Sequence, residues 1–141
     1  LSVSPAHSVT APASSSSSSA VTSLENYFVN YRMHRDKIMT QEIATLKALS
    51  TNMSVSKATR DQATQTMIKD SQELKEETQI EGLLSAAGFP LNASTVTQNK
   101  AIIVVGAKHL SSDQVARIAD TVMEVTHLAP QNIVVLPKNQ G

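Results

Sequence analysis

The chain has 141 residues, 12 basic against 12 acidic side chains, no Cys and no Trp. Its formal net charge of zero argues against a nucleic-acid binder that works through bulk positive charge and against a polybasic membrane-surface module. The absence of Cys excludes disulfides, thiolate zinc sites and thiol nucleophiles, and the low aromatic content (3%) predicts an aliphatic core without an aromatic-lined ligand pocket.

Residues 1–23 are predicted to be a disordered, Ser-rich tether. They consist of Ser, Thr, Ala, Pro and a few apolar residues, with a run of serines at 14–19 and no Lys, Arg, Asp or Glu. Such a segment buries too little apolar surface to offset an ordering cost of about 1–2 kcal/mol per residue. We interpret it as a spacer between an upstream anchor and the folded part, the alternative being a low-complexity tail without a role.

Residues 24–79 are predicted to be a helical region. From Leu24 to about Ser50 there is no Gly or Pro, and apolar residues recur at steps of three and four. Charged residues at 32–37 interrupt this apolar stripe, which predicts a helix that packs over only part of its length.

A second helix is predicted from about 56 to 78, after a polar break at 51–54. It has few apolar residues, so its buried face is expected to be narrow. The acidic side chains near its end are interpreted as a solvated face and not as a metal site: Glu73, Glu76 and Glu77.

Residues 80–138 are predicted to form an α-β-β-α-β unit, which makes the fold class α+β. Its first helix, 80–87, is expected to stop at Gly88 with Phe89 folding back on Leu84, as in a Schellman ending. The later elements are strands at 93–97, 101–105 and 132–136, and a helix that opens with the capping box Ser111/Gln114 and ends near Leu128.

The last two strands are apolar on both faces, although a sheet backed by helices on one side should alternate apolar and polar residues. Either the long N-terminal helices cover the second face or another molecule does. Both alternatives point to association as the function. In the strand 101–105, Ile102 and Val104 lie on one face and Ile103 and Val105 on the other. The last strand repeats this pattern, with Ile133 and Val135 on one of its faces and Val134 and Leu136 on the other.

No catalytic, metal or cofactor site is predicted. The four His residues lack metal-ligand spacing, and the glycines do not form a phosphate loop. A KH-like nucleic-acid module is kept as the alternative because it shares the α-β-β-α-β order, but the loops at 88–91 and 106–109 lack its GxxG motif. The triplet 92–94 (NAS) matches the N-glycosylation acceptor pattern.

The chain resembles the extracytoplasmic domain of the stage III sporulation protein AH family. Several short stretches in order carry the resemblance: 27–37 (YFVNYRMHRDK), 41–43 (QEI), 80–84 (IEGLL), 87–89 (AGF), 102–105 (IIVV), 114–118 (QVARI) and 132–135 (NIVV).

The resemblance implies a ring-building domain similar to those of type III secretion and flagellar basal-body ring proteins. It implies a non-enzymatic protein that needs no cofactor, binds stage II sporulation protein Q and oligomerises into a ring connecting mother cell and forespore. It also implies an upstream anchor in the mother-cell membrane, with this domain in the space between the mother-cell and forespore membranes. No nucleic-acid partner is expected.

Two surfaces are candidates for partner binding. The last strand is a candidate edge for strand addition through Ile133 and Val135. The second is the polar face of the preceding helix, at Arg117, Asp120 and Glu124. The alternative interpretation of these residues is ordinary core for the first two and a solvated helix face for the other three.

Overall fold

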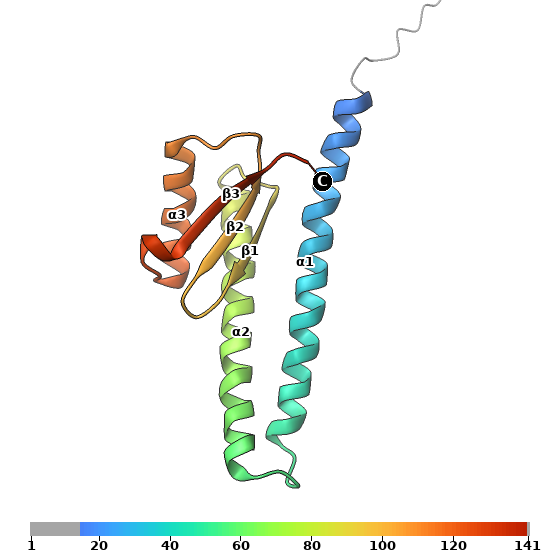
Figure 1. The fold of residues 1–141 in the computed structure, drawn as a ribbon, viewed down its shortest axis with the longest axis vertical. Helices are drawn as coiled ribbons and strands as arrows, with labels where there is room; N and C mark the ends of the chain where they lie inside the picture. Colours follow the sequence, from blue (N-terminus) through green and yellow to red (C-terminus); the bar gives the residue numbers. More distant parts are fainter. Residues whose placement is uncertain (1–14, 141) are drawn as a thin grey trace, which may run out of the picture.

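The computed structural model describes residues 15–140 and has the predicted α+β architecture (Figure 1). Two long helices pair as a hairpin, and a three-stranded sheet with a third helix lies against the second of them. No helix in the described part of the chain is both long enough and apolar enough to cross a membrane. The elements are α1 (Ser15–Ser50), α2 (Lys57–Ala86), β1 (Asn92–Val96), β2 (Ala101–Gly106), α3 (Ser112–Thr126), the 3-10 turn η1 (Pro130–Asn132) and β3 (Ile133–Lys138).

Helix α1 begins earlier than the sequence predicted, at Ser15 instead of Leu24. Residues 15–23 of the predicted tether are therefore helical, and residues 1–14 lie outside the described residues. The reason is that adding a residue to an existing helix is far easier than nucleating one, and Ser and Ala have adequate helix propensity in that setting.

Helix α2 is continuous, whereas the sequence predicted one helix to about residue 78 and a separate one at 80–87. The boundary between the predicted regions 24–79 and 80–138 thus falls inside a helix, because residues 78–80 (TQI) include no Gly or Pro that would end it. The predicted Schellman ending is confirmed: Gly88 has φ of 100°, and the Phe89 N–H donates to the Leu84 carbonyl at 2.8 Å.

The sheet has the order β1-β2-β3, with both β1 and β3 at its edges. β1 and β2 are antiparallel, and Ser94 lies opposite Ile103. β2 and β3 are parallel, with Ile103 beside Val135, and α3 makes the connection that a parallel pair requires. The capping box of α3 is confirmed, since the Ser111 hydroxyl accepts from the Gln114 N–H and the Gln114 side chain accepts from the Ser111 N–H. The helix ends at Thr126, two residues before Leu128, because His127 adopts a left-handed conformation.

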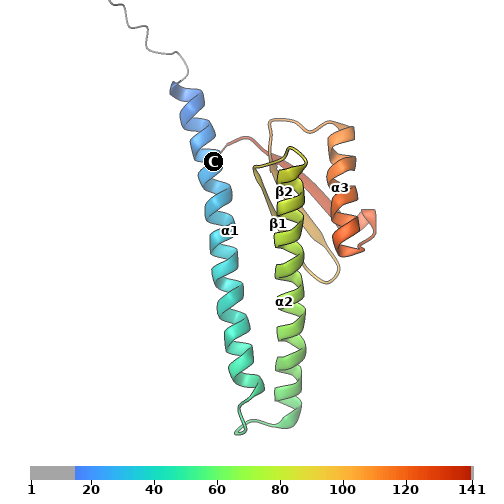
Figure 2. The same ribbon diagram turned by 180° about the vertical axis from the view of Figure 1, so that it is seen from behind.

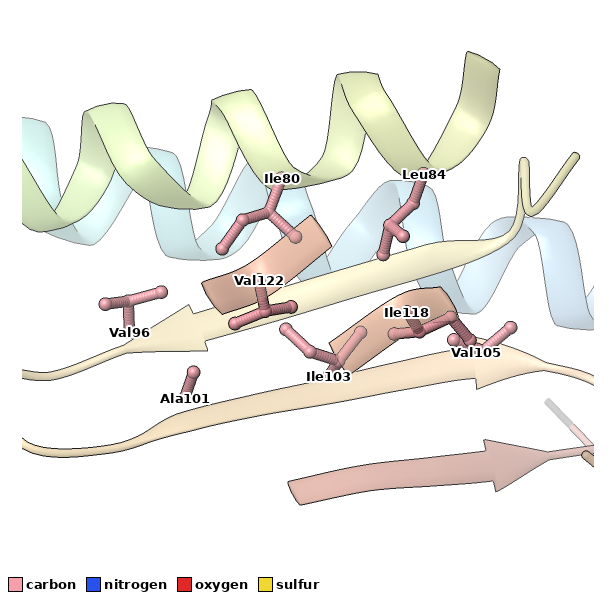
Figure 3. Packing of buried hydrophobic residues seen from close by; sticks show 8 residues of the cluster. All are labelled: Ile80, Leu84, Val96, Ala101, Ile103, Val105, Ile118 and Val122. Carbon is pink, nitrogen blue, oxygen red and sulfur yellow. The ribbon is translucent and has the colours of Figure 1, made fainter. Parts of the chain in front are cut away.

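The main core lies between the sheet and helices α2 and α3, which cover the same face of the sheet (Figure 2). Its side chains are aliphatic, as the composition predicted, and they interdigitate across the two layers (Figure 3). They come from both helices and the first two strands: Ile80, Leu84, Val96, Ala101, Ile103, Val105, Ile118 and Val122.

The opposite face of the sheet is covered in part by α1. Leu24 and Phe28 of α1 pack with Ala93 of β1, and Val104 of β2 packs against this cluster. Toward β3 the cover is incomplete, and Leu136 keeps 46% of its surface exposed. The apolar second face that the sequence indicated is therefore covered from within over β1 and only partly over β3, where Lys138 Nζ lies 4.4 Å from the centre of the Tyr27 ring and Leu136 stays exposed.

Candidate functional site

The free edge of β1 is closed by charged side chains. In antiparallel β1 the main-chain groups of alternate residues point away from β2, and at an edge these groups normally invite another strand. Here Arg32 Nε donates to the Asn92 carbonyl at 2.8 Å, and Arg35 Nη1 donates to the Ser94 carbonyl at 2.7 Å. Both arginines come from α1, which runs beside β1 (Figure 1).

Two carboxylates from α2 complete this closure. The Ser94 N–H donates to Glu81 Oε2 at 2.8 Å, and the Val96 N–H donates to Glu77 Oε2 at 2.8 Å. Four main-chain groups of the β1 edge, two carbonyls and two N–H groups, are thus each bonded to a side chain of opposite charge character. We call Arg32, Arg35, Glu77 and Glu81 the β1 edge cap.

The β1 edge cap is tied together by a two-pronged ion pair. Arg35 Nη1 lies 2.5 Å from Glu81 Oε2, and Arg35 Nη2 lies 3.0 Å from Glu81 Oε1. The Arg35 side chain is 9% exposed and that of Glu81 6%. Burial lowers the pKa of Arg35, but its hydrogen bonds to Glu81 and Asp36 raise it above the ordinary arginine value, so it stays charged. Charge-assisted, two-pronged pairs of this kind fix geometry as well as adding energy.

Glu77 corrects a prediction from the sequence. It was expected on a solvated acidic face with Glu73 and Glu76, but only 3% of its surface is exposed. Burial raises the pKa of Glu77 to about 7, although the Val96 N–H and the Arg35 charge both act to lower it. Its Oε1 has no hydrogen-bond partner and lies 3.9 Å from Arg35 Nε, so the carboxylate is only partly compensated.

The free edge of β3 has no such closure. Ile133 and Val135 are half-buried, and their side chains pack against the main core, while Leu136 and Pro137 are exposed. Within residues 15–140 no side chain hydrogen-bonds to a main-chain group of β3, and a main-chain bond outside the sheet ladder reaches it only at its two ends. The structure thus gives the sheet one closed edge and one open edge.

The other predicted surface residues gather on one exposed side of α3. Arg117, Asp120 and Glu124 are all exposed there. Arg117 also contacts the preceding segment, since its guanidinium lies 5.7 Å from the centre of the Phe89 ring and donates weakly to the Ala87 carbonyl at 3.5 Å. The structure does not bring these residues to Ile133 and Val135 as one site.

The described residues form no candidate metal centre. Groups of three or more His, Asp or Glu that could hold a metal ion are absent there. A groove of about 630 Å³ between α1 and α2 has Lys75 as the one charged side chain in its lining. Asn92, in the glycosylation-like triplet, is fully buried, and its side-chain amide donates to the Phe89 carbonyl at 2.6 Å. A glycan therefore cannot be attached to Asn92 in the folded chain.

The sequence patterns do not predict the β1 edge cap as a unit. They indicate that the charges at 32–37 interrupt the apolar stripe and that the acidic residues of α2 are solvated. A signal was present in each helix. Glu77 and Glu81, four residues apart, share a buried face of α2 with Ile80 and Leu84, and Arg32 and Arg35 are two basic residues three apart on α1.

Comparison with known proteins agrees with this architecture. Residues 3–135 match the protein family described as SpoIIIAH-like protein. One chain of the solved structure of the SpoIIQ-SpoIIIAH pore forming complex is similar in fold, with a TM-score of 0.70 and 20% sequence identity over 81% of this chain and 98% of that chain. A search of curated proteins gave no match.

Proposed function

We propose, from the premise that the chain belongs to the SpoIIIAH-like protein family, that it is the extracytoplasmic assembly domain of a sporulation channel component. In this proposal it acts by binding another protein and not by catalysis. Its partner is stage II sporulation protein Q, or SpoIIQ, the protein named in the complex whose chain shares its fold. The observation that carries the proposal is the contrast between the closed β1 edge and the open β3 edge.

The β3 edge, at Ile133 and Val135, is the proposed surface for SpoIIQ. An open edge offers unpaired main-chain donors and acceptors, and strand addition is a common way to recognise an extended segment. The exposed Leu136 next to this edge adds apolar surface that a partner would cover.

Ring formation is the second part of the proposal. The exposed side of α3 presents both a basic residue, Arg117, and the acidic residues Asp120 and Glu124, which suits contacts between neighbouring copies. We place the domain between the mother-cell and forespore membranes, held there by an anchor in the mother-cell membrane. Copies tethered to one membrane would gain avidity that free copies lack.

Binding to SpoIIQ is tested by mixing the chain with the extracytoplasmic domain of SpoIIQ and measuring the mass of the eluted species by light scattering. A stable complex at micromolar concentration is the expected result. Independent elution of the two proteins at that concentration contradicts the proposal.

Ring formation is tested on a lipid monolayer to which the chain is attached through an N-terminal His tag, with electron microscopy as the readout. Rings are expected for the natural chain, and the double variant Asp120→Lys/Glu124→Lys is expected to lose them while still binding SpoIIQ. Lys57→Glu, at an exposed position at the start of α2, serves as the charge-change control. Rings that persist in the double variant would remove α3 from the proposed ring contact.

A further inference from the structure

The hydrogen-bonding direction of each β3 residue follows from the β1 edge cap. The main-chain N–H groups of Ser94 and Val96 point toward the β1 edge cap, so the main-chain groups of Thr95 between them point toward β2. The main-chain groups of its partner Ile102 therefore point toward β1. Those of the next residue along β2, Ile103, point toward β3. The same alternation continues to the sheet end, where the Ala107 N–H donates to the Lys138 carbonyl at 3.0 Å.

The outer edge of β3 is consequently formed by alternate residues, Ile133, Val135 and Pro137. Their carbonyls all point away from the sheet. Of their nitrogens, that of Pro137 carries no hydrogen, and the Ile133 N–H is already donated to the Pro130 carbonyl of η1. The edge therefore offers three carbonyl acceptors but a single free N–H, that of Val135.

This imbalance disfavours pairing between two copies of the chain. In an antiparallel β3–β3 pair centred on Val135, the two Val135 residues exchange two hydrogen bonds. The Ile133 carbonyl of each copy then faces Pro137 of the other, which has no N–H to give. Pairing of β3 with the β1 edge of another copy is blocked, because the β1 edge cap occupies that edge.

A strand of a different protein does not share this deficit. With an N–H on each of three alternate residues it satisfies all three carbonyls, and one carbonyl of its own accepts from Val135. This gives four hydrogen bonds where a second copy of the chain would give two. On the open face of the sheet, alternate side chains of the incoming strand would lie beside Val134 and Leu136, the latter 46% exposed.

We propose that the β3 edge is built to accept a proline-free extended segment of a different protein, with apolar residues at two alternate positions, and that Pro137 prevents edge-to-edge pairing of copies. The proposal rests on the proposed function for the identity of that protein. It separates two kinds of contact: the sheet edge serves the partner, and a ring of copies uses other faces. A β3–β3 pair would in any case be two-fold symmetric and close as a dimer, not a ring.

The first test needs no partner. Pro137→Val supplies the missing N–H, and the pair centred on Val135 then gains two further hydrogen bonds. The variant is expected to dimerise in sedimentation equilibrium at concentrations where the natural chain is monomeric. The double variant Val135→Pro/Pro137→Val should return to monomer. A monomeric Pro137→Val chain, folded by circular dichroism, overturns the role given to Pro137.

The second test uses the SpoIIQ extracytoplasmic domain and titration calorimetry. Val135→Pro removes the free N–H without touching the bonds between β2 and β3, and it should weaken binding at least tenfold. Val135→Ala shortens the same side chain but keeps the N–H, and it should retain binding within a few-fold. Equal affinities of the two folded variants would overturn the edge proposal while leaving the proposed function intact.

Hydrogen exchange of the natural chain makes the result independent of mutation. The Val135 amide should exchange rapidly in the free chain and become protected in the complex. An unprotected Val135 amide in a formed complex contradicts strand addition. If the natural chain does not bind SpoIIQ at all, the proposed function fails. The self-association of Pro137→Val still decides whether Pro137 prevents β3–β3 pairing between copies.

Discussion

Gly106 and Leu91 approach each other so closely that no side chain fits at position 106. The Gly106 N–H donates to the Leu91 carbonyl at 2.7 Å, and a Cβ added at Gly106 would lie 2.7 Å from the Leu91 Cβ and 3.2 Å from the Phe28 ring. This contact is where the end of β2, the loop before β1 and helix α1 meet. The close packing of α1 on the sheet therefore depends on a glycine.

Gly106→Ala is expected to lower the free energy of unfolding by about 1–3 kcal/mol, because α1 or Leu91 must shift to admit the methyl group. Gly82→Ala is the matched control. A Cβ at Gly82 would meet nothing within 4 Å, and the residue lies inside α2, so this change should stabilise the protein by roughly 0.5–1 kcal/mol. Urea unfolding measures both, and a neutral Gly106→Ala would contradict the tight fit.

Removing one partner of the Arg35–Glu81 pair should be costly. Both side chains are buried, so Glu81→Ala leaves the Arg35 charge without its main partner and the Ser94 N–H without its acceptor. We expect a loss of about 3–5 kcal/mol in the free energy of unfolding. Lys57→Ala, which breaks the exposed pair with Asp61, should cause no measurable change. If Glu81→Ala lowered the free energy of unfolding as little as Lys57→Ala does, the β1 edge cap would contribute little to stability.

The sequence predicts the parts of this fold that depend on local patterns. The α3 capping box, the Gly88 ending of α2 and the aliphatic strands all follow from residue types at fixed spacing, and the structure confirms them. The start of α1 and the continuity of α2 were predicted wrongly, because neither a run of serines nor the polar residues at 78–79 show whether a neighbouring helix continues.

The β1 edge cap depends on contacts between distant segments. Arg35 and Glu81 are adjacent only because α1 and α2 pair as a hairpin beside β1, and charge patterns within each helix do not reveal that pairing. The open β3 edge was a sequence-based candidate, but its acceptor-rich character required the strand order and register. Local patterns such as caps and helix ends can thus be predicted from the sequence. Which edge of the sheet is closed and which is open cannot, because that depends on contacts between distant segments.

The α3 capping box offers a test of local stability. The Ser111 hydroxyl accepts from the Gln114 N–H at 3.1 Å, and Ser111→Ala should lower the free energy of unfolding by about 1 kcal/mol. Ser112→Ala is the matched control, because Ser112 is exposed and lies one position inside the helix. Thermal or urea unfolding should separate the two variants, and equal stabilities would contradict the capping role.

Glu77 should make stability depend on pH in the opposite sense to an ordinary ion-paired carboxylate. Its pKa in the folded chain is raised from the usual 4.5 to about 7 by burial, with Arg35 of α1 and Glu73 and Glu81 of α2 as the charged groups around it. Between these two pKa values the unfolded chain has lost the proton and the folded chain retains it. The contribution of Glu77 to stability is therefore complete below about pH 4.5 and is lost as pH rises through about 7, a change of about 3 kcal/mol.

Glu77→Gln isolates this effect, since the amide cannot ionise and keeps an oxygen to accept from the Val96 N–H. The difference in unfolding free energy, variant minus natural chain, should increase between pH 5 and pH 8, because only the natural chain loses stability from this position. Subtraction cancels the titration of other groups, and Glu124→Gln on exposed α3 reports whether removing any carboxylate has the same effect. A difference that stays constant across this range would mean that the buried Glu77 carboxyl is already ionised at pH 5, with Arg35 compensating its charge fully.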